Sequence, residues 1–308
     1  MKISIIGGAG RVGSCLAFAL QMAGVGSEIV LVDANAQGAA GEALDLLHGA
    51  AFTTSQRIRS GGYDDVAGSD FVVITAGLRR KPDESRLDLI NRNVKLFMDV
   101  LGNVSKVALG PKSNLIVVTN PVDILTQLAY DKSGFAKNRV IGLGTVLDTL
   151  RFRSLLADFF KVSALQVQAL ILGEHGDSMV PLWSTAFVNG VPLTSLAQYD
   201  QKAVMGIFER TRKSGAEVIS LKGGAGYAVG VAILEVIKAI ANDTKALLPV
   251  SSMQSGLYGV QGVCLSVPTR LGANGIEELI EMELWPKEAA ALTSSANSLL
   301  ETLSKVQA

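Results

Sequence analysis

The chain has 308 residues, with 28 basic and 28 acidic side chains and a formal net charge of zero. Apolar residues make up 48 % of the chain, which is enough for a substantial core and excludes wholesale disorder. Zero net charge argues against a broad electrostatic surface for nucleic acid or an anionic membrane, so we expect the partner to be a small molecule or another copy of the chain.

The first half of the chain alternates between short β-rich runs and longer helix-like stretches. We expect strands near Ile3–Ile6, Glu28–Val32, Phe71–Thr75 and Leu115–Thr119. We expect helices near Val12–Ala23, Ala36–His48 and Leu87–Val107. Nearly continuous apolar strands are typical of a parallel sheet covered on both faces, and their alternation with helices predicts a doubly wound α/β fold.

After about residue 144 the pattern changes to α+β. We expect β-like segments at Leu165–Leu172 and Val180–Val191 and a hairpin-rich stretch at Gly256–Pro268. We expect helices near Val146–Phe160, Asp200–Arg212, Ala225–Asn242 and from Pro286 onward. We therefore predict a parallel-sheet domain over residues 1–143, followed by an α+β substrate domain over residues 144–308.

Histidine and cysteine are scarce, and this limits the chemistry. The chain has His48, His175, Cys15 and Cys264 only, so neither a zinc cluster nor a disulfide framework is expected, and we predict no metal. The apolar run at Ile3–Ile6 is too short for a signal peptide, and no run approaches the ~18 residues of a transmembrane helix. We expect a cytoplasmic protein without membrane contact.

A glycine-rich turn follows the first predicted strand. It contains G-x-G-x-x-G at Gly8, Gly10 and Gly13, and Asp33 ends the second predicted strand. The glycines allow a tight turn and close approach to a pyrophosphate, which the start of the next helix attracts. A carboxylate at Asp33 accepts hydrogen bonds from ribose hydroxyls and repels a 2′-phosphate. The pattern predicts a Rossmann domain that binds NAD in preference to NADP.

Two more loops begin at the ends of predicted parallel strands. Thr75-Ala76-Gly77 opens a basic loop that runs to Arg86, and Thr119-Asn120-Pro121 ends another strand. Ligands of open α/β sheets bind beyond the carboxyl ends of the strands. Both loops are therefore candidates for contact with the cofactor or the substrate.

Six segments in succession resemble the lactate/malate dehydrogenase family, and the resemblance covers essentially the whole chain. They are GGAGRVGS, LVDAN, TAGLRRKPDESRLDL, VTNPVD, LDTLRFR and GEHGDSMVPLW. The resemblance implies reversible hydride transfer between NAD and a 2-hydroxy acid, and association into a homotetramer or homodimer.

The resemblance also implies roles for individual residues. His175 would carry the proton, with Asp148 as its orienting partner. Arg151 would bind the C1 carboxylate of the substrate through two hydrogen bonds, and Arg86 would stabilise charge at C2. Asn120 would bind at the junction of cofactor and substrate, and Ala225 would face the substrate pocket. The implied cofactor contacts are Gly8, Gly10, Arg11, Val12, Gly13, Asp33, Thr75, Ala76, Gly77, Asn93, Thr119 and Asn120.

Arg80 decides the expected substrate. In the family an arginine at this position accompanies malate and oxaloacetate, because a guanidinium in a closed site pairs with the second carboxylate. We therefore expect a malate dehydrogenase of the lactate-dehydrogenase-like type, serving the tricarboxylic acid cycle. Gly144–Thr149, Glu174 and Glu84-Ser85-Arg86 instead resemble the lactate branch. The alternatives are an L-lactate or other 2-hydroxy acid dehydrogenase and a non-catalytic NAD-binding sensor.

Overall fold

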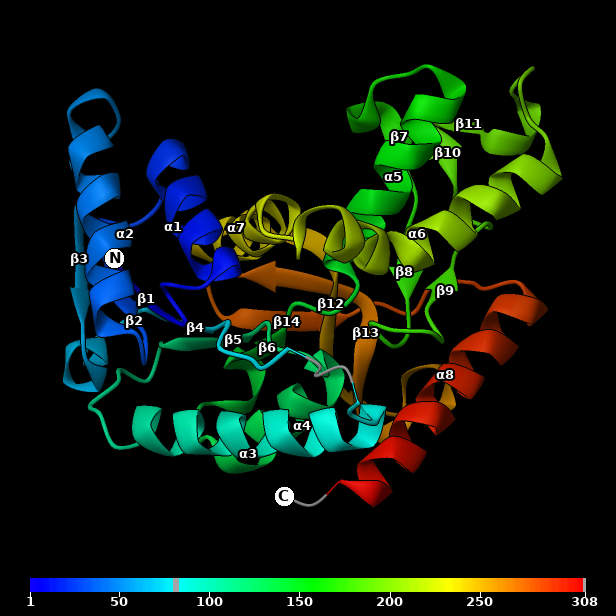
Figure 1. Ribbon diagram of the computed structural model, residues 1–308. Coiled ribbons are helices and arrows are strands. Elements are labelled where there is room, and N and C mark those ends of the chain that lie inside the picture. Colours follow the sequence, from blue (N-terminus) through cyan, green and yellow to red (C-terminus); the bar gives the residue numbers. More distant parts are fainter. Residues whose placement is uncertain (80–82, 307–308) are drawn as a thin grey trace.

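The structure, a computed structural model, describes residues 1–79 and 83–306. A large sheet runs through the molecule, with its strands in the order β14-β13-β12-β6-β5-β4-β1-β2-β3 (Figure 1). Its parallel part comprises β1 (Lys2–Ile6), β2 (Glu28–Val32), β3 (Arg57–Gly61), β4 (Phe71–Ile74), β5 (Asn114–Val117) and β6 (Val140–Gly142).

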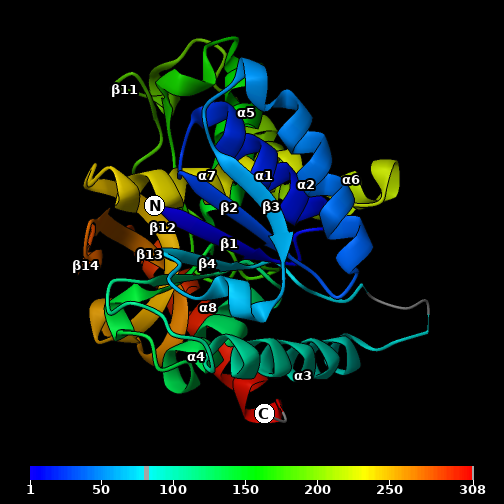
Figure 2. The same cartoon turned by 90° about the vertical axis from the view of Figure 1, so that its left-hand side faces the viewer.

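Helices cover both faces of this sheet. Figures 1 and 2 show one layer of helices above the strands and a second layer below them. The first layer contains α1 (Arg11–Ala23), α2 (Ala36–Gly49) and α7 (Tyr227–Ala241). The second contains α3 (Arg86–Val104), α4 (Val122–Lys132) and α8 (Pro286–Lys305). Strand β1 shows why both layers form, because Ile3 and Ile5 pack on the first and Ile6 packs on the second.

The chain reverses its direction of growth across the sheet between β1 and β4. Strands β2 and β3 extend the sheet on one side of β1, whereas β4, β5 and β6 extend it on the other. The loops after β1 and β4 therefore diverge from adjacent strands and leave a crevice at their carboxyl ends. This order confirms the predicted α/β fold with a Rossmann-type parallel sheet.

The second half of the chain adds to the same sheet. Strands β12 (Ala246–Ser255), β13 (Gln261–Gly272) and β14 (Gly275–Leu279) run antiparallel, and Ser251 of β12 pairs with Gly142 of β6. The predicted boundary at 143/144 stays a prediction, and the sheet continues across it.

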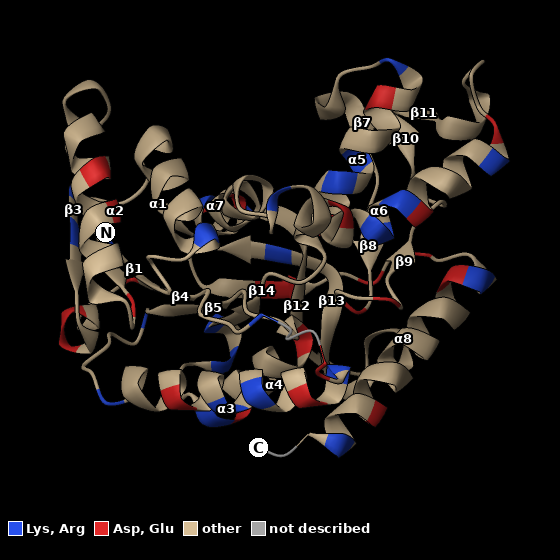
Figure 3. Ribbon diagram, viewed as in Figure 1, with Lys and Arg blue, Asp and Glu red and all other residues tan. Residues whose placement is uncertain are grey.

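A separate layer holds the rest of the second half. Helices α5 (Val146–Phe160) and α6 (Gln201–Lys222) pack with short strands around a third apolar cluster that includes Phe152 and Phe208. The short strands of this layer are β7 (Val167–Gln168), β8 (Ile171–Leu172), β9 (Val180–Pro181), β10 (Phe187–Val188) and β11 (Val191–Pro192), of which β7, β8 and β10 contribute to the cluster. Figure 3 shows basic and acidic residues interspersed along the described helices, in keeping with the zero net charge.

Several elements were not predicted, or were predicted too short, for physical reasons. Strand β3 is a polar edge strand in which Ile58 is buried while Arg59 pairs with Glu28 of β2 at 2.9 Å. Helix α4 is buried almost all round, so it lacks the polar face that distinguishes a helix in a sequence. Helix α6 continues ten residues beyond the predicted end at Arg212. Across the two described ranges, no helix is long and apolar enough to cross a membrane.

Candidate active site

In the turn after β1, the backbone of the glycine residues packs closely against neighbouring backbone. Gly7 has a φ of +92°, which favours glycine. A Cβ on Gly8 would lie 2.7 Å from the Cβ of Leu31, and a Cβ on Gly13 would lie 2.9 Å from the Cα of Gly8. The glycines are thus required for the close packing of α1 against β1 and β2.

The N-terminus of α1 is open to an anion. Gly10 is the N-cap, no side chain caps the helix, and its first turn contains no acidic residue. The N–H groups of a first helical turn have no partner within the helix and carry the positive end of its dipole. The pyrophosphate of a dinucleotide fits this end, which faces the crevice between β1 and β4.

Asp33 lies beside this turn with its carboxylate fixed by the backbone. One oxygen accepts a hydrogen bond from the N–H of Ala9 at 3.0 Å, and the other accepts one from Asn35 at 2.9 Å. A carboxylate has about four acceptor sites, so capacity for ribose hydroxyls remains. The geometry fits the adenosine ribose of NAD.

The ends of β4 and β5 are tied to the glycine turn. The hydroxyl of Thr75 donates to the carbonyl of Gly7 at 3.2 Å, and the hydroxyl of Thr119 donates to that of Ala76 at 2.7 Å. A Cβ on Gly77 would lie 2.8 Å from the methyl carbon of Thr119. The predicted cofactor residues of the three strands therefore form one continuous floor.

Asn93 and Arg11 bind protein groups near this floor. The side-chain oxygen of Asn93 accepts from the N–H of Leu78 at 2.7 Å, and its amide donates to the carbonyl of Leu78 at 3.3 Å. The guanidinium of Arg11 donates to the carbonyls of Lys222 and, at 2.8 Å, Gly224. Both side chains thus hold loops at the rim of the crevice. Ala225 follows Gly224 and packs, with Val12, against the cluster beneath α1 and α7.

Two predicted catalytic residues, His175 and Asp148, meet the predicted substrate-binding residue Arg151 where the loop after β8 lies against α5. The Nδ1 atom of His175 lies 2.5 Å from Oδ2 of Asp148, whose Oδ1 accepts from Arg151 at 3.2 Å. Asp148 is 1 % exposed, whereas the side chains of His175 and Arg151 are 17 % and 15 % exposed. Among the described residues, Asp148 is the only recorded acceptor for the Arg151 guanidinium. That guanidinium can therefore still take a carboxylate in two hydrogen bonds.

The charges of this group shift each other's pKa values. Burial lowers the pKa of His175, but the charge and hydrogen bond of Asp148 outweigh it, so the pKa lies above the ordinary value. Burial raises the pKa of Asp148, but His175 and Arg151 outweigh it and hold the pKa below the ordinary value. The pair therefore favours a protonated imidazole beside an ionised carboxylate.

A second buried carboxylate lies behind His175. Oδ2 of Asp123, in the first turn of α4, accepts the backbone N–H of His175 at 2.8 Å. Burial raises the pKa of Asp123 to about 6, partly offset by the neighbouring hydroxyl of Ser251 and by the N–H of His175. The other oxygen of Asp123 is buried without a recorded partner in the described part of the chain. Asp123 was not among the predicted site residues, although the segment VTNPVD contains it.

Arg86 lies at the start of α3 and reaches the His175 loop. Its guanidinium contacts Asp177 at 2.8 Å and Glu174 at 3.5 Å, and its side chain is 64 % exposed. Neither acid was predicted to contact Arg86. Asn120 is exposed at the end of the β5 loop, and its bond to Pro121 is cis. Arg80, on which the substrate prediction depended, lies outside the described residues.

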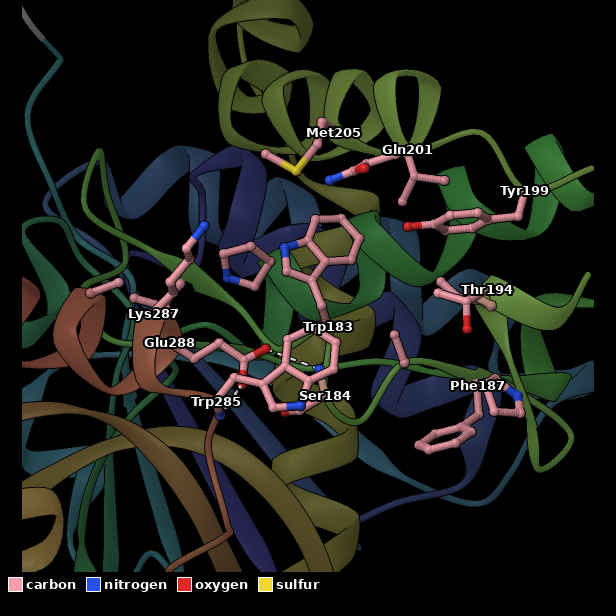
Figure 4. Close-up of a pocket in the computed structure, with 17 residues that line it drawn as sticks. Trp183, Ser184, Phe187, Thr194, Tyr199, Gln201, Met205, Trp285, Lys287 and Glu288 are labelled. Carbon is pink, nitrogen blue, oxygen red and sulfur yellow. Dashed lines mark hydrogen bonds between the residues drawn. The ribbon is translucent and has the colours of Figure 1, made fainter.

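An apolar cavity of about 680 Å³ lies elsewhere, between the β9–α6 region and the start of α8 (Figure 4). Trp183 and Trp285 flank it. Glu288 is buried there, and its carboxylate accepts hydrogen bonds from the backbone N–H groups of Ser184 and Trp285. None of the predicted site residues in the described ranges lines this cavity. Within those ranges, no group of three or more His, Cys, Asp or Glu side chains is arranged to hold a metal ion.

The sheet order, the glycine turn and the His–Asp pair beyond the strand ends define a dinucleotide-binding oxidoreductase. Family comparison makes this specific. A model of the lactate/malate dehydrogenase NAD binding domain matches residues 1–142, and one of the lactate/malate dehydrogenase alpha/beta C-terminal domain matches residues 145–308. The chain belongs to the lactate/malate dehydrogenase family, and it is an NAD-dependent enzyme of that family.

Individual relatives cover the whole chain. L-lactate dehydrogenase 1 of Clostridium acetobutylicum is 44 % identical over 99 % of this chain and 98 % of its own length. An L-lactate dehydrogenase of Acetivibrio thermocellus is 44 % identical over 98 % of this chain and 96 % of its own. The crystal structure of minor L-lactate dehydrogenase from Enterococcus mundtii matches with a TM-score of 0.95 at 35 % identity, covering 99 % of this chain and 98 % of that one.

These relatives overturn the predicted substrate. They are named L-lactate dehydrogenases, so the prediction of a malate dehydrogenase serving the tricarboxylic acid cycle is wrong. That prediction rested on the charge of one side chain, Arg80. The similarity to lactate enzymes extends over the full length, including Gly144–Thr149 and Glu174, which already resembled the lactate branch.

Proposed function

We propose that this chain is an L-lactate dehydrogenase, which interconverts L-lactate and pyruvate with NAD. The observation that carries the proposal is the buried Asp148–His175–Arg151 group beyond the strand ends of a dinucleotide-binding sheet. It supplies a proton carrier and a carboxylate-binding cation together, and a 2-hydroxy acid needs both. The full-length similarity to enzymes named L-lactate dehydrogenase supports the choice of substrate.

The proton transfer follows from the imidazole geometry. Because Nδ1 faces Asp148, Nε2 is the nitrogen that exchanges a proton with the substrate oxygen. Bound NADH supplies the hydride for C2 of pyruvate. His175 donates the proton that completes the hydroxyl, and Asp148 stabilises the imidazolium before that step. In the oxidation of lactate, His175 accepts the same proton.

Two arginines have distinct roles in the proposed reaction. Arg151 binds the C1 carboxylate and fixes the face that C2 presents to the cofactor. Arg86 stabilises the negative charge that develops on the C2 oxygen during reduction. Since Arg86 is ion-paired at the mouth of the site, it must exchange a carboxylate partner for the substrate oxygen. Asn120 and Ala225 remain predicted substrate contacts, whereas the contact predicted for Arg80 belonged to the second carboxylate of malate, which lactate and pyruvate lack.

The proposed cofactor contacts follow the crevice. Gly8, Gly10, Val12 and Gly13 present backbone to the pyrophosphate, with the backbone of Arg11, and Asp33 binds the ribose. Thr75, Ala76, Gly77 and Thr119 form the floor between the strand ends. Asn93 acts through the backbone of Leu78, which it holds.

We also propose a homo-oligomer. Large apolar side chains are exposed on α1, α6 and α7, among them Phe18 at 53 %, Met22 at 60 %, Leu221 at 78 % and Tyr227 at 72 %. Apolar side chains gathered on a few neighbouring helices mark a surface that associates. A second copy of the chain would bury them.

The proposed substrate is tested by the loss of NADH absorbance at 340 nm with pyruvate and, in parallel, with oxaloacetate. The proposal predicts a higher kcat/KM for pyruvate. A higher kcat/KM for oxaloacetate would reject lactate as the substrate while leaving the redox class intact. No turnover with either acid would favour an NAD-binding sensor.

A further inference from the structure

A closed ring of hydrogen bonds joins the His175 loop to the C-terminal helix. Ser295 of α8 is fully buried, and its hydroxyl accepts the backbone N–H of Glu174 at 2.9 Å. The hydroxyls of Ser295 and Ser178 lie 3.0 Å apart, and Ser178 donates to Oε2 of Glu174 at 2.5 Å. The ring thus begins and ends at Glu174.

The direction of each bond follows from the number of protons. A carboxylate has no proton to donate, so the hydroxyl of Ser178 donates its one hydrogen to the carboxylate of Glu174. Ser295 must then be the donor in the contact between the two hydroxyls. Ser295 therefore fixes both the backbone and, through Ser178, the carboxylate of Glu174.

The backbone of the loop is shaped to reach Ser295. Gly173 has a φ of +83°, and a Cβ there would lie 2.7 Å from the hydroxyl oxygen of Ser295. Gly173 also pairs with Ser266 of β13, its N–H donating at 2.9 Å. The loop is thus held directly against α8 and β13 immediately before Glu174 and His175.

The ring leaves the second oxygen of Glu174 facing Arg86. Oε1 lies 3.5 Å from the guanidinium of Arg86, while Oε2 is held by Ser178. The side chain of Glu174 is 13 % exposed, whereas that of Asp177, the other partner of Arg86, is 77 % exposed. The Arg86 guanidinium is itself 64 % exposed, so neither ion pair contributes much alone, although Asp177 makes the shorter contact at 2.8 Å. Glu174 differs in that the ring holds its carboxylate in place, so it is the fixed partner of Arg86.

We infer that Ser295 is a positioning residue for 2-oxo acid reduction. Through Ser178 and Glu174 it fixes the position that the Arg86 guanidinium occupies before it contacts the substrate. The inference rests on the role proposed above for Arg86. It assigns a function to a hydroxyl on the C-terminal helix, more than a hundred positions along the chain from the loop that it orders.

The test is a double-mutant cycle between Ser295→Ala and Arg86→Gln, with Ser294→Ala as the matched control. Ser294 is the neighbouring serine on α8 and is exposed. We expect Ser295→Ala to lower kcat/KM by about fivefold to tenfold, mainly through kcat, with the Kd of NADH unchanged. Ser294→Ala should stay within about twofold of the parent. In the Arg86→Gln background, Ser295→Ala should cause no further loss.

Several outcomes would overturn the inference. It is wrong if Ser295→Ala keeps the parental kcat/KM, or if its effect multiplies with that of Arg86→Gln, because a general structural defect is additive in free energy. It is also wrong if Arg86→Gln itself keeps the parental activity. The cycle is run with whichever 2-oxo acid the enzyme reduces, so failure of the pyruvate assignment is distinguishable from failure of this ring.

A second pair of variants guards against misfolding of Ser295→Ala. Ser178 is only partly buried, and Ser178→Ala breaks the same ring from its other side. Ser178→Thr keeps the hydroxyl. We expect Ser178→Ala to reproduce the loss in kcat/KM and Ser178→Thr to restore most of it. Equal activity of the two variants would contradict the inference.

Discussion

The Nδ1 atom of His175 lies 2.5 Å from the Oδ2 atom of Asp148, and Asp148 is almost completely buried. A charged hydrogen bond therefore joins the loop after β8 to the first turn of α5. This bond fixes which imidazole nitrogen faces the substrate, and it raises the pKa of His175.

The pH dependence of pyruvate reduction tests the electrostatic part of this relationship. Reduction needs the imidazolium, so kcat/KM should be level at low pH and fall as the pH rises through the pKa of His175, above 6.5. Asp148→Asn removes the strongest group that raises this pKa. The falling limb should therefore move to lower pH, and kcat/KM at neutral pH should drop by about 10²–10⁴-fold. If the falling limb of the kcat/KM profile stays at the same pH, Asp148 does not set the pKa of His175.

Asp123 should impose a pH dependence on stability. Its pKa is about 6 in the folded protein against an ordinary 3.8, so the folded state binds a proton more tightly than the unfolded state. The free energy of unfolding should fall by roughly 2–3 kcal/mol from this group as the pH rises from about 4 to about 6. Urea unfolding of the parent and of Asp123→Asn at several pH values measures this contribution. Parallel pH curves for the two proteins would contradict it.

Glycine at position 13 should be required for NADH binding. In Gly13→Ala the new Cβ would meet the backbone of Gly7 and Gly8, which cannot move aside as a flexible side chain can. We expect the Kd of NADH, measured by fluorescence titration, to rise about tenfold or more. Gly102→Ala in α3 is the control, because nothing lies within 4 Å of a Cβ there. Equal Kd values for the two variants would show that the glycine turn is not part of the NADH-binding site.

The exposed apolar side chains on α1 should support the association of the chain into an oligomer. Phe18→Glu places a charge on the proposed interface and should lower the mass measured by light scattering during size exclusion, because an unpaired buried charge opposes association. Leu165→Glu is the control, since Leu165 is 92 % exposed and lies outside α1, α6 and α7. If the measured mass of the assembly falls in both variants, or in neither, the interface does not lie on α1.

Local patterns carried most of what the sequence predicted. Gly8, Gly10, Gly13 and Asp33 lie within one βαβ unit, and their spacing, together with the predicted strand before and helix after the glycines, indicates a dinucleotide turn. The helix that contains Asp148 was predicted with its bounds, Val146–Phe160.

Contacts between distant segments were not predictable in the same way. No local pattern links Ser295 to Glu174 or Asp123 to the backbone of His175, because side chains far apart in sequence meet only when the chain is folded. Nor did a pattern show that β12 pairs with β6. The substrate prediction depended on one charge, that of Arg80, and the full-length similarity to L-lactate dehydrogenases overturned it.

The central claim is that His175 carries the proton of a 2-oxo acid reduction. The most direct measurement is the steady-state turnover of His175→Asn together with its Kd for NADH, with His48→Asn as the control because His48 is exposed on α2. We predict that His175→Asn lowers kcat by about a thousandfold or more while the Kd for NADH stays at the parental value. His48→Asn should match the parent in both. Retained turnover in His175→Asn would contradict the account.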